Sequence, residues 1–425
     1  MTDNALLRRT LEADPARYLK PLKDLVAIDT QVVGHGIAGG REKEGQAYMA
    51  RLLKELGATV TVRQMDEADI ETALARYREG NPGHNYDGRE NVYGFFRGGG
   101  GRSLMFNGHI DTMPPGDVSL WKHPPLPAEV EGGRLYGSGA ADMKSGLMAA
   151  VMAVKLIKDA GMALPGDVVI SSVADEEGGG NGSIAAAVQG LKADGVVVCE
   201  PSDGGLIMAH MGFVFFRVQV TGLANHSGGK WLGVSAIEKS IRLIQAIDEL
   251  EHRWLLKYKH PLLPAPNLNV GTIHGGTAGS TVAGACTFEV CVHYLPFQMT
   301  YDQVVSEFTA AIEWASKGDP WLNEHRPEIA VYQAGGAFEM EREHPFTEAF
   351  LRAHEAALGK KAEIIGSPAG CDSRVWRNIA GCPTLQYGPG RLKECHAIDE
   401  YVTLESYYDA ILTYASLILT WCENT

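Results

Sequence analysis

The chain has 425 residues and a formal net charge of −14, because 52 Asp and Glu outnumber 38 Lys and Arg. This acidic balance argues against nucleic-acid and acidic-membrane partners, which need a basic surface. Apolar residues make up 45% and charged residues 21%, as in an ordinary globular protein. A chain of this length can bury a large core, and its length predicts two domains.

The N-terminal segment MTDNALLRRTLEADPARYLK has no uninterrupted apolar core, so we expect no secretory signal. A membrane span needs about eighteen apolar residues, and the best candidate, LMAAVMAVKLI, is interrupted by Lys155. The cysteines are scattered and form no C-x-x-C pair, which indicates neither a disulfide framework nor a Cys-zinc site. We therefore expect a cytoplasmic protein with no membrane partner.

Helix-like and strand-like segments alternate from the start, which is typical of an α/β domain. Residues 46–65 (QAYMARLLKELGATVTVRQM) predict a helix, a glycine and a strand, and SLMFNGHID (103–111) predicts a buried strand ending in polar residues. A helix is predicted over 146–162, and two further buried strands precede the acids of ADEE and CEPSD. The GGGNG segment between them predicts a turn without the strand–turn–helix pattern of a phosphate loop.

The pattern changes near residue 211. GFVFFRVQVTG alternates like a half-exposed antiparallel strand, and a helix is predicted at about 233–250. Two strands, a helix at about 301–316 and the strand EIAVYQA follow. This β-α-β-β-α-β order is that of a ferredoxin-like sandwich.

The α/β pattern returns after about residue 330, so a smaller domain is inserted into a larger one. We predict an α/β catalytic domain formed by residues 1–210 and 328–425, with a mixed, mostly parallel sheet and helices on both faces. The inserted domain, residues 211–327, is predicted to be ferredoxin-like α+β.

Five polar clusters stand at or just after predicted strand ends: GHID, GAADMKSG, ADEEG, CEPSD and KECHAIDE. Ligands of open α/β sheets bind beyond the carboxyl ends of the strands, so these clusters are expected to converge. Taken singly, each has a simpler interpretation. His109 and Asp111 could belong to a surface loop, Asp142 could be a helix N-cap, and Glu200 and His396 could be solvated.

Three adjacent acids, Asp175, Glu176 and Glu177, need a cation or solvent nearby, because they repel one another and lose hydration at the edge of a core. Adjacent residues leave the backbone in different directions, so one glutamate can bind a metal while the other handles a water proton. In an extended chain His109 and Asp111 project to the same side, which lets Asp111 orient the imidazole. Two His, a bridging Asp and two Glu suit a pair of zinc-like ions, which would supply the positive charge.

The motifs GHIDTM, GRLYGSGAADMKSGLMAA, VADEEGGGNGS, VCEPSD and HAIDEYV, in this order and spacing, resemble the M20 family of metallopeptidases and deacylases. That family includes acetylornithine deacetylase, succinyl-diaminopimelate desuccinylase, aminoacylase and glutamate carboxypeptidase. The resemblance covers nearly the whole chain, including the inserted domain. It implies two divalent metal ions, zinc first, with Mn or Co as alternatives.

The resemblance also implies the ligand sets of the two ions. One metal is expected on His109, Asp142 and Glu200, and the other on Asp142, Glu177 and His396, so that Asp142 bridges them.

The same resemblance gives the expected catalytic residues. Glu176 would be the general base and Asp111 would orient the metal-binding imidazole. In the inserted domain, GLANHSGGKWLGVSAIEK matches the family stretch whose histidine, His226 here, reaches across a dimer to the reacting carbonyl. The inserted domain is accordingly expected to act as a lid and to form a homodimer.

Departures from the family pattern concern the substrate. Ser280 stands where relatives have Asn, and His293 replaces an arginine that commonly binds a substrate carboxylate and offers a bidentate fork that His lacks. Arg374 could be the remaining carboxylate anchor or part of a structural salt bridge. Gly388, in YGPGR, resembles the glycine-rich loop that lines the same pocket.

These residues predict a metal-dependent hydrolase of a C–N bond, first of all a deacylase of an N-acyl amino acid or related small carboxylate. The alternatives within the family are a metallocarboxypeptidase or dipeptidase, and an atypical hydrolase of an aromatic amine or amide, which Ser280 and His293 favour. A non-catalytic relative would have lost part of the ligand set, and in particular Glu176, whereas here every position is filled.

Overall fold

The computed structural model describes residues 3–423, which form two compact units. Unit 1 comprises the chain up to Met208, Met340–Ile365 and the chain from Cys371 on. Unit 2 comprises Ala209–Glu339 and the short return Gly366–Gly370.

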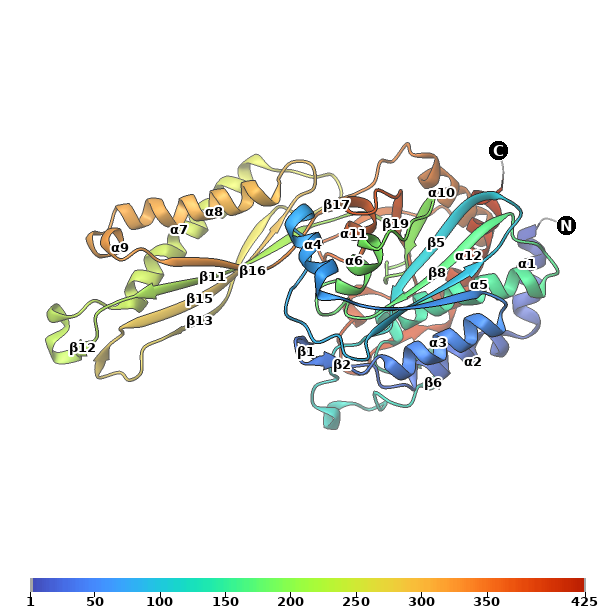
Figure 1. Cartoon of the computed structure of the whole chain (residues 1–425), viewed down its shortest axis with the longest axis horizontal. Helices are drawn as coiled ribbons and strands as arrows, with labels where there is room; N and C mark the ends of the chain where they lie inside the picture. Colours follow the sequence, from blue (N-terminus) through green and yellow to red (C-terminus); the bar gives the residue numbers. More distant parts are fainter. Residues whose placement is uncertain (1–2, 424–425) are drawn as a thin grey trace. The chain divides into compact units, whose positions relative to one another are not determined.

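A mixed sheet forms the centre of unit 1 (Figure 1). Its strands, in spatial order, are β17 (Phe338–Glu339), β10 (Leu206–His210), β19 (Thr384–Gln386), β9 (Gly195–Val198), β5 (Gly101–His109), β8 (Gly166–Val173), β4 (Glu90–Phe96) and β3 (Thr59–Gln64), with β18 (Ile364–Ser367) also beside β10. The four central strands β19, β9, β5 and β8 are parallel, whereas β4, β3 and β10 are antiparallel to their neighbours.

Helices cover both faces of this sheet because its central strands are apolar on both sides. Met105 of β5 packs into a cluster with Ile184 and Trp376, which belong to α6 (Asn181–Val188) and α11 (Ser373–Asn378). The next residue, Phe106, faces the other way. Its ring lies 4.8 Å from that of Tyr414 in α12 (Leu404–Trp421). The predicted α/β class is therefore confirmed.

The remaining helices of unit 1 are α1 (Asp3–Ala13), α2 (Pro15–Val26), α3 (Lys43–Glu55), α4 (Glu67–Tyr77), α5 (Ser145–Asp159) and α10 (Pro345–Leu358). Its short strands form a hairpin, β1 (Val32–Gly36) with β2 (Gly39–Gly40), and a small sheet of β6 (Glu129–Glu131), β7 (Arg134–Tyr136) and β20 (Tyr401–Thr403). The segments predicted as α3, β3, β5, α5, β8 and β9 are all present. The expectation for GGGNG was wrong in one respect, because α6 begins within it at Asn181.

Unit 2 is an antiparallel sheet with helices on one face. Its strand order is β13 (Asn267–Gly275), β15 (Ala285–Tyr294), β11 (Gly212–Thr221) and β16 (Glu328–Gly335), and its long helices are α7 (Ala236–Lys257) and α8 (Tyr301–Lys317). Alternate residues of β11 are buried, and Phe216 stacks on Phe308 of α8 at 3.9 Å. Smaller elements are β12 (Asn225–His226), β14 (Thr281–Val282) and α9 (Pro320–Glu324). This order is the ferredoxin-like one that the sequence predicts.

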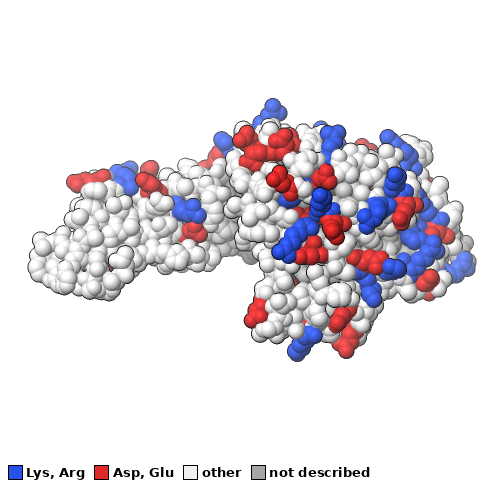
Figure 2. Space-filling view, turned by 60° about the horizontal axis from the view of Figure 1, so that its bottom comes forward, with Lys and Arg blue, Asp and Glu red and all other residues white. Residues whose placement is uncertain are grey.

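Acidic and basic side chains are interspersed over the face of the molecule in Figure 2 rather than gathered by sign. Among the helices of residues 3–423, none combines the length and apolar character that crossing a membrane requires.

Candidate metal centre

Six polar side chains from distant parts of the sequence meet at one edge of the unit 1 sheet. His109 ends β5, Glu176 and Glu177 lie just beyond the end of β8, and Glu200 lies just beyond the end of β9. Asp142 lies in the turn before α5, and His396 in the segment between β19 and β20. Because β5, β8 and β9 are parallel, their carboxyl ends lie at the same edge, which is where ligands of such sheets bind.

Asp142 lies between the two imidazoles. Its Oδ1 is 3.1 Å from Nε2 of His109, and its Oδ2 is 3.4 Å from Nε2 of His396. Each imidazole has a second carboxylate beside it. Glu200 Oε1 lies 3.6 Å from His109 Nε2, and Glu177 Oε1 lies 2.9 Å from His396 Nε2. The cluster thus has two sets of donor atoms that share one carboxylate.

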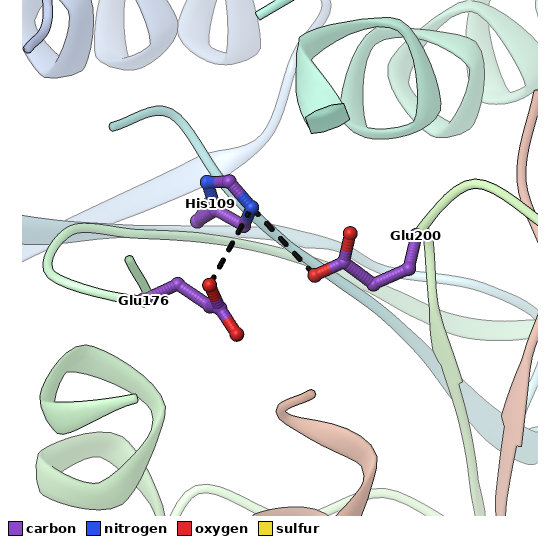
Figure 3. Close-up of side chains that lie close together, drawn as sticks. All are labelled: His109, Glu176 and Glu200. Atoms are coloured by element: carbon purple, nitrogen blue, oxygen red, sulfur yellow. Dashed lines mark ion pairs between the residues drawn. The ribbon is translucent and has the colours of Figure 1, made fainter. Parts of the chain in front are cut away.

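Glu176 lies on the His109 side of the cluster. Its Oε2 is 3.9 Å from His109 Nε2, so that His109 faces both Glu176 and Glu200 (Figure 3). One donor atom from each of these three residues can be chosen so that all lie within 4.8 Å of one another, and the same holds for His109, Asp142 and Glu177. Glu176 is therefore close enough to His109 and Glu200 to share a metal ion with them.

The cluster carries more negative than positive charge and is largely enclosed, except that the His396 side chain is 48% exposed. Burial raises the pKa of Glu176, Glu177 and Glu200. Burial lowers the pKa of His109, but its hydrogen bond to Asp142 and the surrounding carboxylates outweigh this and raise it well above the ordinary value. Hydrogen bonds to Asp142 and Glu177 raise the pKa of His396 to about 11.

These shifts all favour extra positive charge at the cluster. Imidazole nitrogens combined with carboxylate oxygens are the donors that zinc and similar divalent ions prefer. The residues therefore fit divalent metal ions.

Asp111 has a different contact from the one expected. The hydrogen bond from His109 Nδ1 goes to the main-chain oxygen of Asp111, at 2.9 Å, while the side-chain Oδ1 is 3.6 Å away. The Oδ2 of Asp111 accepts the main-chain N–H of Glu177 at 3.0 Å. Asp111 thus contacts both a histidine and a glutamate of the cluster.

The segment before α5 is held by a residue that the sequence analysis missed. Glu400 is buried, and its carboxylate accepts the N–H groups of Gly139, Ala141 and Asp142 at 2.8–3.0 Å. Asp142 itself has non-helical backbone angles and is not the N-cap of α5. Glu400 lies within HAIDEYV, but its contacts are with residues more than 250 positions away.

Asp175, the first of the three adjacent acids, points away from the cluster. Its two oxygens pair with Arg89 and His84, at 2.8 and 2.7 Å. The expectation that metal ions neutralise all three acids was therefore wrong for Asp175, whose counter-charge comes from the protein.

Two predicted substrate residues lie in unit 1. Arg374 is buried, and its guanidinium donates to Glu79 Oε2 at 3.0 Å and to the main-chain oxygens of Cys371 and Gly179. These are the contacts expected if Arg374 belongs to a structural salt bridge rather than to a substrate-binding site. Gly388 lies against the segment that carries Glu200, because a Cβ at this position would be 2.3 Å from the oxygen of Cys199 and 2.7 Å from that of Glu200.

The other two predicted substrate residues, Ser280 and His293, lie in unit 2, as does the predicted catalytic residue His226. His226 is exposed, and its Nδ1 accepts the N–H of Gly228. Ser280 lies near it, because the main-chain oxygen of Ser280 accepts the N–H of Ser227 at 2.8 Å. His293 is on β15, where its Nδ1 lies 3.3 Å from Asn267 Oδ1. Burial lowers the pKa of His293.

The sequence profile of peptidase family M20/M25/M40 matches residues 105–420. The chain belongs to this family. Among curated proteins it is similar to the N-formyl-4-amino-5-aminomethyl-2-methylpyrimidine deformylase of Bacillus subtilis (strain 168), with 30% identity over 98% of this chain and 97% of the relative. It is also similar to the acetylornithine deacetylase of Edwardsiella ictaluri, with 29% identity over 77% of this chain and 82% of the relative.

The solved structures support the fold. The M20 family metallo-carboxypeptidase Sso-CP2 from Sulfolobus solfataricus aligns with a TM-score of 0.74 at 17% identity, over 95% of this chain and 99% of that one. Family membership and the cluster together establish this protein as a metal-dependent hydrolase of C–N bonds.

Proposed function

We propose that this enzyme removes the formyl group from an N-formylated aminomethyl heteroaromatic amine. The Bacillus deformylase named above matches nearly the full length of both chains, which supports a substrate of this kind. The observation that carries the proposal concerns the two positions at which a substrate carboxylate was expected to bind. At neither position is a guanidinium available to pair with a carboxylate. Position 293 has His, and the guanidinium of Arg374 is committed to Glu79 and two main-chain oxygens. A substrate without a carboxylate suits such a site.

We propose His109, Asp142 and Glu200 as ligands of one metal and Asp142, Glu177 and His396 as ligands of the other. The placement of the two Asp142 oxygens toward different imidazoles supports this assignment. Zinc is the proposed metal, because both donor sets combine imidazole nitrogen with carboxylate oxygen. Metal ions held there would supply the positive charge that acidifies water and polarises a carbonyl oxygen.

The protein's own groups then move the proton. The Glu176 carboxylate takes a proton from the water that attacks the formyl carbon, and later delivers it to the amine nitrogen as the C–N bond breaks. The products are formate and a free amine. The main-chain oxygen of Asp111 keeps the Nδ1–H of His109 engaged, so that Nε2 faces the cluster.

The role of His226 remains a proposal drawn from the family resemblance. A homodimer formed through unit 2 would bring the imidazole of His226 of the partner subunit to the carbonyl oxygen, where a single hydrogen-bond donor contributes about 3 kcal/mol. The lid role of unit 2 and a cytoplasmic location also remain predictions. An active monomer in light scattering would contradict the dimer.

The proposal is tested by measuring formate and amine release from metal-reconstituted protein. The panel is N-formyl-4-amino-5-aminomethyl-2-methylpyrimidine, its N-acetyl counterpart, N-acetylornithine and a dipeptide. We expect the formyl compound to give a kcat/KM at least about 10-fold above its N-acetyl counterpart, because one methyl group in a fitted pocket changes kcat/KM by about 10–200-fold. Preferred hydrolysis of N-acetylornithine would replace the proposal with the amino-acid deacylase that the sequence first predicts.

The assignment of Glu176 needs a separate control. Glu176→Gln keeps the size of the side chain but cannot accept the proton. We expect turnover to fall by on the order of 10²–10⁴-fold while metal content, measured by mass spectrometry, stays at the wild-type level. A large loss of metal would instead identify Glu176 as a ligand, as its place beside His109 and Glu200 also allows.

A further inference from the structure

A buried chain of four charged or polar side chains lies behind the metal centre. Arg89 donates through Nε to the carboxylate of Glu42 at 3.0 and 3.1 Å, and its Nη2 also contacts Glu42. On its other side, Nη1 of Arg89 lies 2.8 Å from Oδ1 of Asp175. The Oδ2 of Asp175 lies 2.7 Å from Nδ1 of His84. We call this set of four residues the Asp175 network.

The Asp175 network is enclosed. The side chains of Glu42, Arg89 and Asp175 are 0% exposed, and that of His84 is 5% exposed. Two glycines lie against Asp175. A Cβ at Gly36 would be 2.3 Å from Asp175 Oδ1, and a Cβ at Gly178 would be 2.4 Å from it. The Asp175 carboxylate is therefore closely packed against the main chain on this side.

Asp175 also has an unusual backbone. It follows β8 with a φ of 63°, in the left-handed region that non-glycine residues rarely adopt. Such a conformation persists only where surrounding contacts over-determine it. Here the contacts are those of the side chain with Arg89 and His84, and they hold the residue directly before Glu176 and Glu177.

We propose that the Asp175 network positions Glu176 and Glu177 in the metal centre. Arg89 and His84 hold the Asp175 side chain away from the cluster, and the left-handed turn then directs the next two carboxylates into it. On the far side, Asp111 fixes the N–H of Glu177. Arg89 and His84 are positioning residues in this scheme, since they touch neither substrate nor metal.

A charged network is a costly way to obtain stability alone, because well-packed apolar residues often serve equally well. What charges and directed hydrogen bonds add is a fixed orientation, and outer residues of this kind commonly change metal affinity or activity by about 10–100-fold. The inference rests on the metal-site roles proposed above for Glu176 and Glu177, but not on the formyl substrate.

The test uses a pair of substitutions at His84. In His84→Asn the amide nitrogen can occupy the place of Nδ1 and still donate to Asp175, whereas His84→Leu cannot donate. Leu22→Ala removes a buried side chain of α2 that is not part of the Asp175 network, and serves as a control that destabilises unit 1. Each protein is assayed at full length for kcat, KM, bound metal per chain and melting temperature.

We expect His84→Leu to lower kcat, or the affinity for the metal proposed on Asp142, Glu177 and His396, by about 10–100-fold, with KM changed less than about threefold. His84→Asn should keep values close to those of the wild type. Leu22→Ala should lower the melting temperature and leave kcat and metal content unchanged. If His84→Leu fails to fold, Asp175→Asn, which keeps the shape and removes the charge, replaces it with the same expectation.

Wild-type kcat and metal content in His84→Leu, with only a lower melting temperature, would overturn the inference and leave the network a structural feature. A wild-type enzyme that is inactive on the formyl compound would contradict the proposed substrate instead. The metal titration needs no substrate, so it separates these two failures.

Discussion

Replacing Glu400 by Gln tests how firmly the Asp142 segment is held. The pKa of Glu400 is raised to about 7, chiefly by burial, so at pH 8 its carboxylate is ionised and accepts three N–H groups. In Glu400→Gln the amide oxygen can keep the bonds to Ala141 and Asp142, but the amide N–H₂ faces the N–H of Gly139. One charge-assisted bond, worth about 1.5–3 kcal/mol, is lost, and relief from burying a charge offsets part of it.

We therefore expect Glu400→Gln to lower the free energy of unfolding by about 2 kcal/mol, and Glu400→Ala, which leaves all three donors unpaired, by about 2 kcal/mol more. The assay is urea denaturation of chelator-treated protein at pH 8. Glu343→Gln, an exposed change of the same kind, should stay within about 0.5 kcal/mol of wild type. If Glu400→Ala costs no more than this control, the Asp142 segment does not depend on Glu400.

Three further predictions follow from charge and burial. Removal of metal by a chelator should lower the free energy of unfolding by about 2.7 kcal/mol for each filled site, and so by about 5.4 kcal/mol for two, relative to protein kept at a metal concentration a hundred times the dissociation constant. The change is read from urea midpoints, and an unchanged midpoint would mean that no metal binds. Arg374→Met removes the guanidinium from buried Glu79 and should cost about 3–5 kcal/mol while KM stays near wild type, whereas a raised KM with unchanged stability would make Arg374 a substrate anchor. Burial lowers the pKa of His354, which lies between the ring of Tyr387 and the main-chain oxygen of Lys360. The unfolded chain then takes up the proton first, so the contribution of His354 to stability is complete above about pH 6.5 and is lost as the pH falls through the lower folded pKa. His354→Asn, which can keep the N–H donor but cannot titrate, should therefore lose less stability than wild type between pH 7.5 and pH 5.

The convergence of the residues in the candidate metal centre could be predicted because it depends on rules that act along the chain. His109, Glu176 and Glu200 each follow an apolar run that reads as a buried strand, and parallel buried strands bring their carboxyl ends together. The β-α-β-β-α-β order of unit 2 is likewise visible in its alternation of apolar residues. These features need only periodicity and order.

The supporting contacts could not be predicted in this way. Arg374 pairs with Glu79 across 295 positions, and Glu400 caps a segment more than 250 positions before it. An arginine or a glutamate at the end of a motif has the same sequence pattern whether it faces a substrate or a main-chain N–H. The choice depends on which donors and acceptors the tertiary fold leaves unpaired, and no local pattern carries that information.

The three adjacent acids show where this limit lies. Their mutual repulsion correctly indicates nearby positive charge, and for Glu176 and Glu177 the donor set around them fits metal ions. Asp175 is neutralised by Arg89, which lies 86 positions earlier and is itself paired with Glu42. Because the left-handed turn at Asp175 separates its carboxylate from the two that follow, one run of like charges is divided between a protein cation and the candidate metal centre. Repulsion between the three carboxylates also opposes any rotation that would bring the Asp175 side chain toward the cluster. The His84 variants test how much the contact with His84 adds to this orientation of Asp175.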